Sequence, residues 1–203
     1  MSPCIVGFSC GKLEKLENEY LKSLIVQAVA DAIAKTALEP IDIDAIYIGA
    51  MTADLCRHEF PASLILQAYP DLHCKPATRV ENDCATGSAA IYQGFSSIAE
   101  KSVRFALVVG AAKIKHLSST TMGDVLIKTS YIPEGVKILF GFVCVFSNIT
   151  DLYFEKYSIQ FDTLVRIPAK NHRNGACNPS SCLSGDVLPF LFALRRSVFP
   201  LHA

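Results

Sequence analysis

Two short runs of apolar, β-branched residues constrain the fold of this chain most. "AIYIGAM" at residues 45–51 and "VRFALVVGA" at residues 103–111 are typical of strands that are buried in a parallel sheet. Apolar residues recur at helical spacing from Asn18 to Leu38, and a further helix is expected from Cys84 to about Ala99. Strands and helices that alternate along a chain indicate an α/β fold with a mostly parallel sheet.

Three further elements fit this alternation. Residues 4–8 and "ATRVE" at residues 77–81 favour short strands. Phe60-Pro61 opens a helix that we expect to extend to about Ala68, because proline is tolerated in the first helical turn. The first 111 residues therefore form a layered α/β unit in this interpretation.

The chain changes character after this unit. Residues 112–135 are polar and turn-rich, and a helical stretch is expected from about Asn148 to Ala169. The tail from Cys182 to Ala203 shows neither helix caps nor periodicity from which an element could be assigned.

Composition excludes several classes of protein. Lys plus Arg equals Asp plus Glu at 19 each, and this neutrality argues against nucleic acid as the main partner. The longest apolar stretch, residues 136–146, is far shorter than the roughly 20 residues of a membrane span. No signal-peptide pattern follows Met1, so we expect a cytoplasmic protein without a membrane partner.

The eight cysteines raise the question of disulfides or a metal site. Without a secretion signal, free thiols are favoured over disulfides. Cys177 and Cys182, with His172 nearby, offer one conceivable zinc site, but a second pair of ligands with zinc-site spacing is missing. We therefore expect no bound metal, and a cytosolic redox or metal protein remains a minor alternative.

"VENDCATGSAAI" at residues 80–91 places Cys84 at a corner between a strand and a helix. A helix N-terminus favours the thiolate, which is the nucleophilic form, and its N–H groups can stabilise an oxyanion. Glu81 and Asp83 oppose thiolate formation if they point inward. Taken alone, these residues favour the simpler alternative, a small buried residue in a tight turn.

The segment "RVENDCATGSAAIYQG" resembles the nucleophile motif of the thiolase family, in which the active cysteine is followed by a small residue, Ser or Thr, and Gly. "ALVVGAAK" at residues 106–113 and "PAKNHRNGACNP" at residues 168–179 resemble later family segments in the same order. The resemblance covers about residues 4–180 and is strongest to the acetyl-CoA acetyltransferases of bacteria and archaea and to the sterol-carrier-type thiolases.

This resemblance implies the N-terminal half of a thiolase-like fold with a mixed, mostly parallel five-stranded sheet. Its parts are an α/β core at residues 1–111, a loop subdomain and return segment at residues 112–181, and an unassigned tail at residues 182–203. Cys84 is then expected to form an acyl-cysteine in Claisen condensation or thiolysis of an acyl-CoA. The CoA thioester is a substrate, and no separate cofactor is implied. The resemblance implies a position near the CoA channel for His172, but a solvated loop histidine is the favoured interpretation.

The chain also departs from the family pattern. It has about half the usual length, and the N-E-x-F, H-P and C-x-G motifs of the second thiolase half do not occur in it. The base that activates the nucleophile and the second catalytic cysteine are therefore expected from a separately encoded C-terminal half, or the chain forms a homo-oligomer. The alternative function is a non-catalytic thiolase-like remnant that acts as a binding or assembly module.

Overall fold

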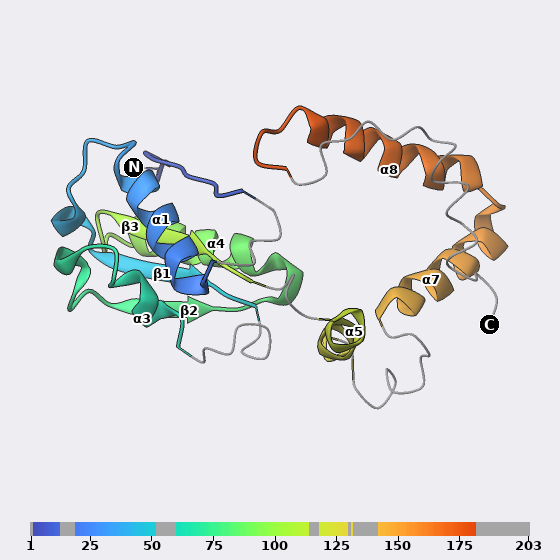
Figure 1. The fold of residues 1–203 in the computed structure, drawn as a ribbon, viewed down its shortest axis with the longest axis horizontal. Coiled ribbons are helices and arrows are strands. Elements are labelled where there is room, and N and C mark those ends of the chain that lie inside the picture. Colours follow the sequence, from blue (N-terminus) through green and yellow to red (C-terminus); the bar gives the residue numbers. More distant parts are fainter. Residues whose placement is uncertain are drawn as a thin grey trace. The chain divides into compact units, whose positions relative to one another are not determined.

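A computed structural model of the chain describes residues 2–12, 19–51, 60–113, 118–129, 131 and 142–181 (Figure 1). The chain forms two compact units. The first unit comprises residues 1–11 and 15–117, and the second comprises residues 12–14 and 118–203.

A parallel sheet forms the centre of the first unit. Its strands are β1 (Ala45–Gly49), β2 (Ala77–Val80) and β3 (Ala106–Gly110), in the order β2-β1-β3. Ile46 pairs with Ala77 on one side and with Leu107 on the other, so both neighbours run parallel to the central strand. The predicted α/β fold with a parallel sheet is confirmed. The predicted five strands are not: the described residues contain three.

Helices cover both faces of this sheet. Helix α4 (Thr86–Ala99) packs on the face that includes Tyr47, whose hydroxyl lies 2.6 Å from the Oγ of Ser97. Because successive strand residues point to opposite faces, Ile46 and Ile48 point away from α4, and both are fully buried. Helices α1 (Leu21–Ile33) and α3 (Ala62–Ile65) cover that second face (Figure 1).

The buried residues of α1 explain why its sequence forms a helix at this position. They recur every four residues and so lie on one face of the helix, namely Leu21, Ile25, Val29 and Ile33. This helix is shorter than the predicted span of residues 18–38. The helix predicted from residue 60 to 68 is also shorter, since α3 has four residues and is followed by the 3-10 helix η2 (Pro70–Leu72).

The predicted strand at residues 4–8 is wrong. Residues 2–12 form neither helix nor strand, and the side chains of Ile5, Val6 and Phe8 are exposed. An apolar run indicates a strand only where a neighbouring strand offers backbone partners and a core buries the side chains. The structure provides neither burial nor pairing for this segment.

The described part of the second unit is helical. It consists of α5 (Ser119–Ile127), α7 (Phe142–Tyr157) and α8 (Phe161–Ala176). The single helix predicted for residues 148–169 is therefore two helices. They separate at Ser158, whose φ of 72° lies in the left-handed region and ends α7.

The tail predicted at residues 182–203 lies outside the described residues, and the threefold division of the chain stays a prediction. Among the helices that the structure describes, none has the length and apolar character needed to cross a membrane.

Candidate functional site

The carboxyl ends of the parallel strands define the candidate site. The chain leaves β1 toward α3 on one face of the sheet and leaves β2 toward α4 on the opposite face. Open α/β sheets bind ligands at the carboxyl ends of adjacent strands whose connections diverge in this way. The turn between β2 and α4, residues 81–86, lies at this point and contains Cys84.

Cys84 lies in the 3-10 helix η3 (Asp83–Ala85), directly before the first residue of α4. It is a free thiol on an exposed residue. The turn is closed by a hydrogen bond of 2.9 Å that the Ala85 N–H donates to the Asn82 carbonyl. The predicted corner between strand and helix is thus present, and the alternative that Cys84 is buried in it is wrong.

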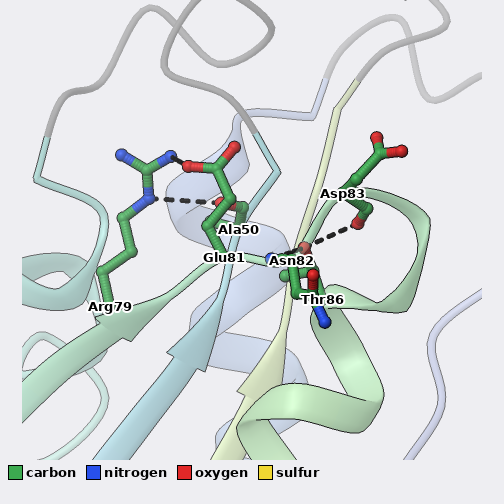
Figure 2. A network of polar contacts seen from close by, with 6 residues as sticks. All are labelled: Ala50, Arg79, Glu81, Asn82, Asp83 and Thr86. Carbon is green, nitrogen blue, oxygen red and sulfur yellow. Dashed lines mark hydrogen bonds and ion pairs between the residues drawn. The ribbon is translucent and has the colours of Figure 1, made fainter. Parts of the chain in front are cut away.

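Thr86 makes the central contacts of this turn (Figure 2). Its buried hydroxyl donates to the Asp83 carbonyl over 2.6 Å and accepts from the Asn82 N–H over 2.8 Å. Asp83 has a φ of 46°, a left-handed conformation that costs free energy for a residue with a Cβ. The Thr86 hydroxyl therefore supports a backbone geometry that the chain would otherwise disfavour.

Two acidic residues flank Cys84, and sequence alone did not show whether they point toward the thiol. Glu81 forms an ion pair with the guanidinium of Arg79, with 2.5 Å between Oε2 and the nitrogen. The Nε–H of Arg79 also donates to the carbonyl of Ala50, just beyond β1, over 3.2 Å. Figure 2 shows the Asp83 carboxylate directed away from Thr86 and outward from the turn. One of the two flanking acids is therefore paired with a cation, and the other points outward.

Close packing between α4 and β1 positions the start of the helix. A Cβ added to Gly49 would lie 3.1 Å from the Thr86 methyl carbon and 3.2 Å from the Thr86 carbonyl oxygen. Both distances are tighter than ordinary van der Waals contact. The absence of a side chain at the end of β1 thus allows the first turn of α4 to approach the sheet.

The side of α4 that faces away from the sheet is apolar and exposed. Ile91, Tyr92 and Phe95 are 55%, 71% and 48% exposed, and with Ser88 they follow helical spacing on one side. We call these four residues the outer face of α4. The opposite side of the helix carries its buried residues, Thr86, Ala90, Gly94 and Ser97.

The second predicted site residue, His172, belongs to the second unit. His172 is half-buried within α8 of the second unit, whereas Cys84 belongs to the first unit. A solvated loop histidine is therefore the wrong description of His172. Cys177 is exposed and follows α8, and Cys182 lies outside the described residues. Within the ranges that the structure describes, no three His, Cys, Asp or Glu residues gather as metal ligands would.

Sequence reasoning did not assign roles to Thr86 and Arg79. Thr86 carried a usable signal, because threonine near a helix N-terminus commonly bonds nearby backbone groups. Arg79 carried a weaker signal: alternation along β2 places Arg79 and Glu81 on the same side of the strand. The bond from Arg79 to Ala50 depends on strand pairing and had no local signal.

Comparison with known proteins identifies relatives over most of the chain. The model of the family described as "Thiolase, N-terminal domain" matches residues 4–198, further than the residue 180 at which the resemblance was expected to end. An acetyl-CoA acetyltransferase of Methanocaldococcus jannaschii is 31% identical over 181 residues, which are 86% of this chain and 44% of that protein. A second, from Methanothermobacter thermautotrophicus, is 24% identical over 177 residues, 86% of this chain and 45% of that protein. The chain spans less than half the length of these curated relatives.

Proposed function

Because this chain belongs to the thiolase family through its N-terminal domain, we propose that Cys84 is the nucleophile of a thiolase-type acyl transfer from acyl-CoA. The observation that carries this proposal is the position of Cys84. It is an exposed free thiol in the 3-10 turn that precedes helix α4, two residues before the helix begins, within the segment that the family model matches. A thiol in this position reacts as a thiolate that the N-terminal end of the helix stabilises.

The first half-reaction is a transfer between two sulfur atoms. The Cys84 thiolate attacks the thioester carbonyl of acyl-CoA, and a new bond forms between Sγ and the acyl carbon. The bond between that carbon and the CoA sulfur then breaks, and CoA leaves as a thiolate that takes up a proton. Backbone N–H groups at the start of α4 stabilise the intermediate oxyanion. The pairing of Glu81 with Arg79 limits the negative charge that opposes the attacking thiolate.

The second half-reaction, Claisen condensation or thiolysis, needs an acid or base that no family motif in this sequence supplies beside Cys84. We propose that a separately encoded C-terminal half or a second copy of the chain completes the site. The outer face of α4 supports this, because apolar residues exposed together on one helix side mark an interaction surface. His172 is proposed to contribute to CoA binding, and the reaction is proposed to take place in the cytoplasm.

A second candidate function is a non-catalytic binding or assembly module that keeps the family fold. The same outer face of α4 favours it, since this surface can bind a partner whether or not Cys84 reacts. The two candidates differ in one property, which is formation of an acyl-cysteine.

The test is intact-mass spectrometry of the purified chain after incubation with acetyl-CoA. The proposal predicts an adduct of one acetyl group that is absent in Cys84→Ala and retained in Cys74→Ala, which removes another exposed free cysteine. Peptide mapping then places the acetyl group on Cys84. If folded protein forms no adduct, or forms it equally in both variants, the non-catalytic module becomes the better description.

A further inference from the structure

We propose that Thr86 is the positioning residue of the Cys84 turn, a role that rests on the proposed function of Cys84 as nucleophile. Thr86 is only 6% exposed, which is unusual for a polar residue at the start of a helix next to an exposed turn. In the described residues the other buried polar side chain is Ser97, and its hydroxyl bonds to Tyr47 and to the Gln93 carbonyl. Ser97 thus serves packing of α4 on the sheet, whereas the contacts of Thr86 are directed to the turn.

Thr86 connects the residues on both sides of Cys84 in the sequence. Its hydroxyl binds the two residues that precede Cys84, accepting from the Asn82 N–H and donating to the Asp83 carbonyl. Its backbone begins α4 two residues after Cys84. A single side chain therefore ties the residues before the thiol to the helix after it (Figure 2).

The backbone that Thr86 holds is one that needs support. Asp83, directly before Cys84, is left-handed with a φ of 46°, and such residues persist where surrounding contacts determine them. The Thr86 methyl group packs against the end of β1, where Gly49 leaves room for it. The sheet thus fixes Thr86, and Thr86 fixes the conformation of the turn that carries the nucleophile.

This arrangement predicts that the hydroxyl of Thr86, and not merely its volume, sets the reactivity of Cys84. Thr86→Val keeps the shape of the side chain and removes both hydrogen bonds, whereas Thr86→Ser keeps the hydroxyl. Displacement of a reacting group by about 1 Å can lower a rate by up to about a hundredfold. We expect Thr86→Val to slow reaction of Cys84 by about tenfold, and Thr86→Ser to react within about threefold of the unmodified chain.

The experiment measures alkylation by iodoacetamide at each cysteine by peptide mass spectrometry. Cys4, Cys10 and Cys74 are exposed free thiols in the same unit and serve as internal controls for the reagent and for the fold. The proposal requires slower alkylation of Cys84 in Thr86→Val with unchanged control cysteines, and recovery in Thr86→Ser. Unchanged or faster alkylation in Thr86→Val, or an equal loss in Thr86→Ser, overturns it.

A second measurement needs no variant and remains decisive if Thr86→Val does not fold. The Asn82 amide, bonded to the Thr86 hydroxyl, is expected to exchange with deuterium slowly in the unmodified chain. Fast exchange of this amide overturns the positioning role.

Incubation with acetyl-CoA separates failure of this inference from failure of the proposed function. If the unmodified chain forms no acetyl-Cys84 while alkylation still depends on the hydroxyl, the acyl transfer fails and the positioning of the thiol stands. If the unmodified chain and Thr86→Val form acetyl-Cys84 at equal rates, the acyl transfer stands and the role of Thr86 is wrong.

Discussion

Arg79 forms an ion pair with an acidic residue of the Cys84 turn. Its guanidinium pairs with Glu81, three residues before the thiol. Arg79→Gln removes this positive charge from beside the carboxylate, and the added repulsion of the thiolate should slow alkylation of Cys84 by about twofold in low salt. Site-resolved alkylation, read by peptide mass spectrometry with Cys10 as the internal reference, measures the change.

The double variant Arg79→Gln with Glu81→Gln separates charge from structure. It removes both charges, so the rate of Cys84 alkylation should return to that of the unmodified chain. A rate that stays low in the double variant contradicts the electrostatic role. It would instead assign the effect to the lost hydrogen bond between Arg79 and the Ala50 carbonyl.

Asp44 is the residue from which we expect a distinct pH dependence of stability. The backbone N–H groups of Phe105 and Arg104 donate to its carboxylate over 3.0 and 2.8 Å and lower its pKa below the ordinary 3.8. A lowered pKa in the folded state stabilises the fold above the unfolded pKa, and this stabilisation is lost as the pH falls through the folded pKa. Asp44→Asn should therefore lower the free energy of unfolding by about 1 kcal/mol at pH 7.

Urea unfolding from pH 7 down to pH 3 tests this expectation. The gap between the unmodified chain and Asp44→Asn should narrow as the pH falls below about 4. Asp71→Asn, at an exposed aspartate of η2, controls for the general loss of one negative charge and should leave the stability almost unchanged. A gap that is the same at both pH values contradicts the role of the ionised carboxylate.

At the scale of the element, Gly94 permits close packing of α4 on β3. A Cβ at this position would lie 2.9 Å from a methyl carbon of Val108 and 3.6 Å from the Cβ of Ala106. Gly94→Ala should therefore force the helix and strand apart and lower the free energy of unfolding by about 1–3 kcal/mol. Thermal or urea unfolding measures the loss.

Gly87 offers a matched control in the same helix. A Cβ there would have nothing within 4 Å, and alanine suits a helix better than glycine. Gly87→Ala should leave the stability unchanged or raise it by up to about 1 kcal/mol. Equal losses in the two variants would show that helix–strand distance is not the cause.

The elements that sequence predicted correctly are those in which local pattern and burial agree. The strand of "AIYIGAM" is buried at Ile46 and Ile48, and α1 buries one residue in four. In both elements the apolar pattern therefore matches the side chains that the core buries. Residues 4–8 show the limit of this reasoning, because an apolar run does not determine whether a neighbouring strand pairs with it. The separation of α7 from α8 at Ser158 was missed because no glycine or proline marks that left-handed residue.

In the candidate site, too, features that depend on neighbouring residues could be predicted and features that depend on strand pairing could not. The position of Cys84 between a strand and a helix could be predicted, since it depends on neighbouring residues. The pairing of Glu81 and the contact of Arg79 with Ala50 could not, because both depend on how strands align in the sheet. The buried hydroxyl of Thr86 is an intermediate case, with a local signal whose target only the structure shows.

At the scale of the whole molecule, the outer face of α4 is expected to drive association of the isolated chain. Tyr92 and Phe95 are 71% and 48% exposed, and burying aromatic side chains of this size contributes about 1.5–3 kcal/mol each. Replacing both by serine should weaken self-association at least about tenfold, which corresponds to about 1.4 kcal/mol. Sedimentation velocity over a range of protein concentrations measures the association constant.

The matched control replaces two other exposed apolar residues of the same unit, Ile41 and Phe60, which are 57% and 65% exposed. Serine at these positions lowers surface hydrophobicity to a similar extent but leaves α4 intact, so association should persist. A purified chain that is monomeric at all concentrations and melts cooperatively contradicts the role of this face. If association instead weakens equally in both double variants, general apolar exposure is the cause, and the outer face of α4 is not the surface that binds the proposed C-terminal half or a second copy.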